Sequence, residues 1–300
     1  TFSIEARFGF NKTTRGLWVL DSFKALAVGL VIGVPLLMLL LWLVNEAGRY
    51  WWLWAWASMM LFQWVMLVIY PTIIAPIFNK FTPMPESETK SAILALLSRC
   101  GFTSNGLFVM DGSKRTSHGN AYFTGLGNAK RIVFFDTLLN RLKQDELLAV
   151  LAHELGHFKN NHIKKRMIFS AIGSLIVFAL LAALMNAPWF YEGLGFSPDE
   201  TDSAMTRPAT ALVLFMLALP VFSFFLTPIA SWYSRRHEFE ADHYGASQTS
   251  KDALIRALVC LYEDNAATVT PDALYSMFYD SHPSAPLRIA HLSSLNPATP

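Results

Sequence analysis

The chain has 300 residues, of which 53% are hydrophobic and only 15% charged, and its mean hydropathy is +0.34. This composition argues against a soluble protein with buried helices. The formal net charge of +2 gives no case for nucleic-acid binding, and two cysteines are too few for a disulfide framework.

Four long runs without a charged residue predict membrane-spanning helices. They cover residues 25–45, 50–79, 167–191 and 208–234. Even the shortest run has 21 residues, and a helix needs about 20 to cross the hydrocarbon core. Trp and Tyr gather at the ends, as at Trp51, Tyr191 and Trp232, which is typical of an aromatic belt. We therefore predict a multi-pass protein of the lipid bilayer.

The basic residues predict the orientation. Four precede the first run, 13 lie in residues 80–166 and five follow residue 234, whereas the loops 46–49 and 192–207 hold one each. Positive residues concentrate on the cytoplasmic side of a membrane. Residues 80–166 and 235–300 are thus predicted to face the cytoplasm, from a bacterial inner membrane or, in a eukaryote, the endoplasmic reticulum.

The segment between the second and third runs predicts a helix and a small sheet. Residues 83–85 are a breaker, residues 91–100 read as a helix, and residues 107–110, 121–124 and 132–135 read as short strands, the last two joined by a turn at 125–128. The edge of such a sheet can accept an extended peptide as a further strand. Asn120, at the head of one strand, could hold a substrate carbonyl or serve as a turn residue, and both interpretations carry equal weight.

His153-Glu154-Leu155-Gly156-His157 is an H-E-x-x-H motif in a stretch of helical apolar spacing. Residues four apart lie on one helix face, so both imidazoles can bind one Zn²⁺. Glu154 lies beside that face, where it can take a proton from zinc-bound water. A chance match on a surface helix remains the alternative for the motif alone.

A third protein ligand is predicted from the segment Arg235–Asp242. Glu238 and Asp242 share a helix face, so Glu238 can bind the metal while Asp242 accepts the free N–H of a ligand histidine. A solvated acidic helix end would explain the same residues, but this pattern shares the chain with H-E-x-x-H. A third histidine ligand just after the motif is excluded, because Ile163 stands where it would be required. His162 misses that register by one residue and is predicted to be a surface residue or a support for a ligand.

Six separated motifs resemble, in order, those of the M48 integral-membrane zinc metallopeptidases of the Ste24 or CaaX prenyl protease 1 type. They are EARFGFNKTT at 5–14, DGSKRTSHGNAY at 111–122, RIVFFDTL at 131–138, HELGH at 153–157, RRHEFEAD at 235–242 and YDSHP at 279–283. The resemblance runs from residue 1 to about residue 290. It implies seven spans around an intramembrane chamber. Because the chain begins with Thr1 and carries four runs, we expect a fragment without the first two spans, and hydropathy does not place the seventh.

The resemblance also implies roles for individual residues. The zinc ligands would be His153, His157 and Glu238, with Glu154 as general base and Asp242 supporting a ligand. The family's substrate-contacting N-A-Y motif corresponds to Asn120, Ala121 and Tyr122.

His282 corresponds to the family's late histidine, which supports the oxyanion. A positioned imidazole can stabilise developing charge in this way, although a surface loop histidine is the alternative. Four other histidines are predicted to lie on the surface or on helix faces: His118, His237, His243 and His291. Arg288 is predicted to be an ordinary surface arginine, and the alternative is that it orients a site carboxylate.

The predicted fold is mostly α, with polytopic membrane helices, a cytoplasmic-side zinc metallopeptidase helical core and a small β-sheet. Its four parts are an N-terminal polar segment with two spans, a segment with the sheet and the H-E-x-x-H helix, two further spans, and a C-terminal segment with the third ligand. Their bounds are 1–79, 80–166, 167–234 and 235–300.

The predicted function is a zinc-dependent membrane endopeptidase of CaaX prenyl protease type, with one Zn²⁺ per chain and a peptide or protein substrate that is prenylated in the family. The alternative is a membrane quality-control endopeptidase with unprenylated substrates. A zinc transporter or sensor is a reading from another class, but transporters carry metal residues within spans and have no need of Glu154. A pseudoprotease would be expected to lose one of the four chemical residues, and none is lost.

Overall fold

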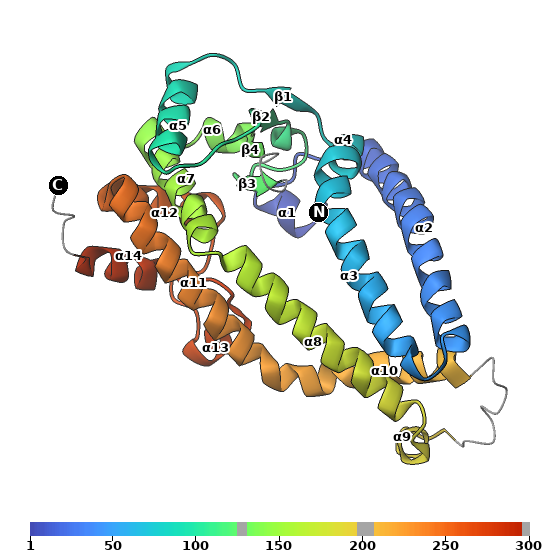
Figure 1. The fold of residues 1–300 in the computed structure, drawn as a ribbon. Helices are drawn as coiled ribbons and strands as arrows, with labels where there is room; N and C mark the ends of the chain where they lie inside the picture. The colour runs from blue at the N-terminus through green and yellow to red at the C-terminus, as the bar shows by residue number, and fades with distance from the viewer. Residues whose placement is uncertain (125–130, 197–206, 296–300) are drawn as a thin grey trace. The chain divides into compact units, whose positions relative to one another are not determined.

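The computed structural model describes residues 1–124, 131–196 and 207–295 (Figure 1). The predicted turn at 125–128 lies outside these residues. The chain divides into two compact units. The sheet unit comprises Thr1–Lys24, Leu67–Ile163 and Pro228–Pro300, and the span unit comprises Ala25–Met66 and Lys164–Thr227. The described residues are mostly helical with one small sheet, which confirms the predicted fold class.

Within the described residues, four helical stretches are long and apolar enough to cross a membrane, and each overlaps a predicted run. They are Arg15–Glu46 (α2), Gly48–Phe78, His162–Leu184 (α8) and Arg207–Gln248. The second consists of α3 (Trp51–Ile69), a π-helical turn at Tyr70–Ile74, and α4 (Ala75–Phe78). Pro71 lies at the start of that turn, and a π-bulge is one of the few ways a helix accommodates proline. The fourth consists of α10 (Arg207–Ser223), a 3₁₀ turn and α11 (Thr227–Gln248).

The span unit has a narrow core and an apolar exterior. Its core includes Trp51, Ala55, Leu181 and Phe215. Outside that core, large apolar side chains such as Leu217 on α10 are exposed. Apolar surface of this kind is unfavourable in water and is typical of helices that face lipid.

The third span ends earlier than the sequence predicts. The hydrophobic run continues to Tyr191, but α8 ends at Leu184 and the chain turns into the short helix α9 (Pro188–Glu192). Tyr191 is only 1% exposed, and its hydroxyl donates a hydrogen bond to the carbonyl of Met185 at 2.8 Å. Tyr191 therefore packs inside the protein, where its hydroxyl finds a hydrogen-bond partner.

The sheet has four strands in the order β1-β2-β4-β3 (Figure 1). Their bounds are Phe81–Pro83 (β1), Leu107–Met110 (β2), Ala121–Thr124 (β3) and Arg131–Phe135 (β4). β2 and β4 are parallel, and the other two pairs are antiparallel. The three predicted strands are confirmed. β1 was missed because Pro83 signals a breaker, yet proline is tolerated on an edge strand.

Helices α5 (Glu88–Arg99) and α7 (Gln144–Lys159) pack with the sheet to form the core of the sheet unit. The predicted helix at 91–100 begins earlier because the Ser87 hydroxyl accepts the N–H of Lys90 and caps it. α7 lacks a capping hydroxyl at Lys143, but the Lys143 N–H donates to Glu146 Oε2, which completes half of a capping box.

The C-terminal helices complete the sheet unit. α12 (Lys251–Asp264) packs against both α7 and α14 (Ala285–Ser294). Leu254 and Leu258 of α12 and Leu292 of α14 share a buried cluster with Ala149 of α7. The remaining short helices are α1 (Ile4–Arg7), α6 (Asp136–Leu139) and α13 (Ala273–Tyr279).

Candidate metal centre

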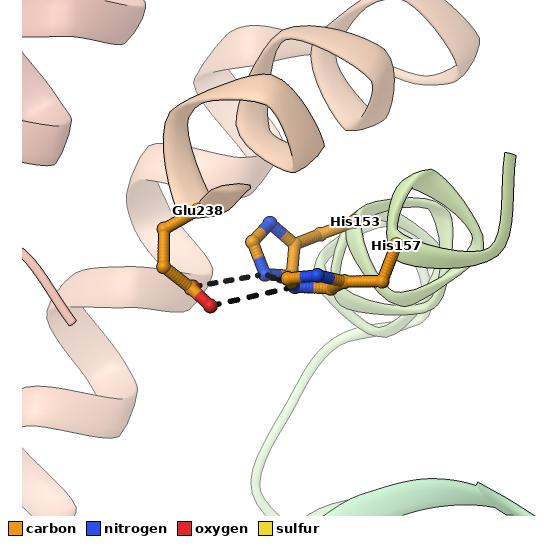
Figure 2. A group of neighbouring side chains, drawn as sticks. All are labelled: His153, His157 and Glu238. Atoms are coloured by element: carbon orange, nitrogen blue, oxygen red, sulfur yellow. Dashed lines mark hydrogen bonds and ion pairs between the residues drawn. The ribbon is translucent and has the colours of Figure 1, made fainter. Parts of the chain in front are cut away.

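Helix α7 turns two imidazoles towards a carboxylate on α11 (Figure 2). His153 Nε2 and His157 Nε2 lie 3.3 Å apart. The carboxylate oxygens of Glu238 lie 3.4 Å from His153 Nε2 and 3.5 Å from His157 Nε2. These three residues are the one group of potential metal ligands found within the described part of the chain, with their donor atoms within 4.8 Å of one another.

The spacing of these atoms fits a tetrahedral cation. Zn²⁺ binds imidazole nitrogen and carboxylate oxygen at about 2.0–2.2 Å, so its tetrahedral ligands lie about 3.3–3.6 Å apart. The observed separations of 3.3, 3.4 and 3.5 Å fall in that range, with the two imidazoles facing different oxygens of the Glu238 carboxylate. Two nitrogens and one carboxylate are also the donor set of a catalytic zinc site, which leaves a fourth position for water or substrate.

Two glycines allow α7 and α11 to approach closely enough for this geometry. A Cβ on Gly156 would lie 2.9 Å from Ala241 Cα, and one on Gly245 would lie 3.0 Å from the backbone nitrogen of His153. Both distances are shorter than ordinary van der Waals contact. The glycine inside H-E-x-x-H therefore has a packing role, because it lets the helix carrying Glu238 lie against the helix carrying the histidines.

A buried ion pair supports the first imidazole. His153 Nδ1 lies 2.8 Å from Asp242 Oδ1. Arg288 of α14 donates from Nε and Nη2 to the two oxygens of Asp242, at 2.8 and 2.5 Å. Asp242 is fully buried and Arg288 is 8% exposed, so the guanidinium supplies the charge that a buried carboxylate requires.

The same contacts shift the titration of the site. Burial alone would lower the pKa of His153, but its hydrogen bonds to Asp242 and Glu238 outweigh burial and raise it. Burial raises the pKa of Glu154, opposed by the charges of His153 and Arg288. Burial would lower the pKa of Arg288, whereas the hydrogen bond and charge of Asp242 raise it.

His282 lies at the edge of this centre. Its Nε2 is 3.5 Å from Glu238 Oε1, and its side chain is 64% exposed. It lines a pocket of about 420 Å³ together with Tyr262, Asp280 and other residues of the C-terminal segment. Arg235 of α11 donates to the carbonyls of Ser276 in α13 and of Asp280 just after that helix, at 2.9 and 2.8 Å.

Asn120, Ala121 and Tyr122 lie at and just before β3, the edge strand next to β4. Ala121 and Tyr122 pair with Phe134 and Val133 of β4. The Asn120 carbonyl accepts the N–H of Phe135 at 2.9 Å. These residues therefore belong to the sheet, and β3 contacts α7, the helix that carries His153 and His157.

Several residues of the site differ from the prediction. Arg288 is buried against Asp242, so the preferred surface position was wrong and the alternative, that it orients a site carboxylate, agrees with the structure. His237 was expected on a surface or helix face, yet it is 2% exposed and stacks on His162 with ring centroids 4.0 Å apart. The surface positions were wrong because the partners of both residues lie far away in the sequence. The local spacing of polar residues does not reveal such partners.

The long apolar helices and the His–His–Glu centre together define a class: multi-pass membrane proteins that carry a metallopeptidase-type centre. The family model "Peptidase family M48" matches residues 83–296, and "CAAX prenyl protease N-terminal, five membrane helices" matches residues 1–80. The chain therefore belongs to peptidase family M48, in its CAAX prenyl protease branch. Membership implies a metal cofactor, and the N-terminal match together with the four long apolar helices makes it an integral membrane protein.

Named relatives agree with this assignment. The chain is 39% identical to CAAX prenyl protease 1 of Saccharomyces cerevisiae, over 97% of this chain and 66% of the relative. It is 33% identical to the CAAX prenyl protease 1 homolog of Homo sapiens, over 98% and 69%. The crystal structure of S. mikatae Ste24p matches with a TM-score of 0.89 and 37% identity, over 97% and 70%. The chain thus spans about two thirds of the length of these relatives.

Proposed function

We propose that this chain is a zinc-dependent membrane endopeptidase of the CAAX prenyl protease type. His153, His157 and Glu238 would hold one Zn²⁺ per chain. The observation that carries the proposal is the approach of Glu238 to both imidazoles of H-E-x-x-H, at 3.4 and 3.5 Å, across two helices that are distant in sequence.

When bound, Zn²⁺ would supply Lewis acidity to the scissile carbonyl and the attacking water. Glu154, half-buried next to His153, takes the proton from that water and returns it to the leaving amine. Asp242 holds His153 in the tautomer that directs Nε2 to the metal.

His282, whose Nε2 lies 3.5 Å from Glu238 Oε1, would donate a hydrogen bond to the oxyanion of the substrate as it develops. Its exposure and its pocket are consistent with contact to a substrate from outside. Asn120, Ala121 and Tyr122 would hold an extended peptide along the β3 edge by main-chain pairing.

The substrate is proposed to be a protein with a C-terminal CaaX motif, since the relatives bear the name CAAX prenyl protease. These names do not favour the alternative of a membrane quality-control endopeptidase. The site is proposed to face the cytoplasm, because 13 basic residues lie in 80–166 and only one in each of the loops 46–49 and 192–207. In a eukaryote, the corresponding membrane would be the endoplasmic reticulum.

Glu154→Gln separates the chemistry from metal binding. The purified chain should keep its zinc, because Glu154 is not a ligand, while peptidase activity falls by about 10²–10⁴-fold, the usual contribution of a general base. Metal analysis measures the zinc content, and a cleavage assay measures the activity. Glu263→Gln, at an exposed position on α12, is the matched control and should change neither quantity. An undiminished rate in Glu154→Gln would refute the proposed base.

Glu238→Gln and His157→Ala test the ligands. A neutral amide is a poor zinc ligand, so both variants should lose zinc together with activity. Retention of a full equivalent of zinc in either variant would remove that residue from the metal site.

Two substrates distinguish the proposed function from its alternative. A farnesylated CaaX peptide and its unprenylated counterpart should be offered side by side to the purified chain, with and without a chelator. Cleavage of the farnesylated peptide alone, abolished by the chelator, supports the proposal. Equal cleavage of both peptides would favour the quality-control activity.

A further inference from the structure

The second histidine of H-E-x-x-H contacts another histidine that the proposed chemistry does not use. His157 turns Nε2 towards Glu238, and its Nδ1 lies 3.0 Å from His162 Nδ1. The other nitrogen of His162, Nε2, lies 3.0 Å from Glu240 Oε2. Arg236, one helical turn before Glu240, donates to Glu240 Oε1 at 3.2 Å.

The backbone between α7 and α8 places His162 in this position. Asn161 has a φ of +57°, in the left-handed region that asparagine tolerates better than most residues. The helical path is therefore interrupted after α7, and His162, the first residue of α8, contacts His157 in the last turn of α7. His162 is 1% exposed, and its ring stacks on His237 with an interplanar angle of 9°. The ring is thus held by packing as well as by hydrogen bonds.

These contacts are consistent with a single arrangement of protons. A metal on His157 Nε2 requires the ring hydrogen to lie on Nδ1, so Nδ1–H can donate to His162 Nδ1. His162 then carries its own hydrogen on Nε2, where the Glu240 carboxylate accepts it. In this arrangement the facing nitrogens, His157 Nδ1 and His162 Nδ1, do not both carry a hydrogen.

The two ligand imidazoles are therefore supported in parallel ways. His153 meets the Asp242 carboxylate directly, and Arg288 binds that carboxylate. His157 reaches the Glu240 carboxylate through the ring of His162, and Arg236 binds that carboxylate. Both carboxylates come from α11, the helix that carries Glu238.

We propose that His162 and Glu240 are positioning residues that orient His157 for the metal. The proposal rests on the metal site proposed above and adds a second supporting chain to it. Groups that orient a metal-bound histidine commonly contribute about 10–100-fold in metal affinity. This change in affinity can be measured without a substrate.

The decisive variant is His162→Phe, which keeps a flat ring to stack on His237 and removes both ring nitrogens. Zinc affinity of the purified chain, measured by competition with a chelator, should fall by about 10–100-fold. The visible spectrum of the Co²⁺-substituted protein should change as well, since it reports the geometry of the ligands. Glu240→Ala should weaken affinity in the same direction, and Glu240→Gln, which retains an acceptor oxygen, should recover part of the loss.

Matched controls separate this role from general packing. Two variants should bind zinc like the unmodified chain. His243→Phe changes an exposed histidine on α11, the helix of Glu240. Glu86→Ala breaks the ion pair of another glutamate with a basic residue four positions away. Glu240 is partly exposed, so Glu240→Ala decides the question if His162→Phe does not fold.

The outcomes distinguish the two proposals. Unchanged zinc affinity and an unchanged Co²⁺ spectrum in His162→Phe and Glu240→Ala, with binding still dependent on His157, would overturn the positioning role alone. Binding that survives His157→Ala in the unmodified background would instead overturn the metal site itself.

Discussion

At the scale of single residues, we expect the largest loss of stability from substitutions in the buried ion pair of Arg288 and Asp242. Arg288→Met would leave the buried Asp242 carboxylate without its countercharge, and removing one partner of a buried pair costs about 3–5 kcal/mol of stability. We expect a lower thermal melting midpoint in detergent and weaker zinc binding. The double variant Arg288→Met with Asp242→Asn should recover stability but not zinc affinity, because an amide supports His153 less well. A single variant as stable as the parent would contradict the burial of an ion pair.

The site contacts that sequence spacing predicts and those that it leaves open differ in one physical respect. His153 and His157 are four apart, and so are Glu238 and Asp242, so helical geometry alone places each pair on one face. Arg288 is 46 positions from Asp242, and His162 is 78 positions from Glu240. Such partners depend on how helices pack, which no local period encodes. The proximity of Glu238 to the histidines is also a tertiary fact, which the sequence could reach only through a match of several motifs.

At the scale of elements, the contact between α7 and α11 depends on the absence of two side chains. In Gly245→Ala the new methyl group would lie 3.0 and 3.1 Å from backbone atoms of His153, closer than ordinary van der Waals contact. Overpacking of this kind costs about 1–3 kcal/mol, and the shift of α11 would carry Glu238 with it. We expect a lower melting midpoint and reduced zinc affinity.

Gly173→Ala provides the control, because a Cβ there meets nothing within 4 Å inside α8. That substitution should leave zinc affinity unchanged and favour the helix slightly. Equal behaviour of the two alanine variants would show that the close approach of α7 and α11 does not limit the site.

Elements with a strong local signal were predicted well, and those decided by tertiary contact were not. Three strands and the H-E-x-x-H helix follow from their own periodicity. β1 has only three residues and ends in proline, so its identity depends on pairing with β2. The end of α8 at Leu184 is likewise set by the burial of Tyr191, although the apolar run continues to that residue.

At the scale of the whole molecule, the number of spans follows from hydropathy, whereas their orientation rests on the distribution of basic residues. Single cysteines in a variant lacking Cys100 and Cys260 test it in intact cells. An impermeant thiol reagent should fail to label Glu86→Cys, at an exposed position between the second and third spans, and should label Glu192→Cys, which is exposed beyond the third. Met110 is a poor position for this purpose because it is buried. The opposite pattern would reverse the orientation.

The arrangement of the ligands has a further consequence for assembly. His157 and Glu238 are separated by 81 positions, and the intervening chain includes α8 and α10. A metal bound by both would act as a cross-link that closes this long loop, in the manner of a disulfide. Insertion of the spans depends on their apolar length and needs no metal. We therefore expect the metal-free chain to be fully inserted yet easily cut by protease near α11, and added Zn²⁺ to protect that helix.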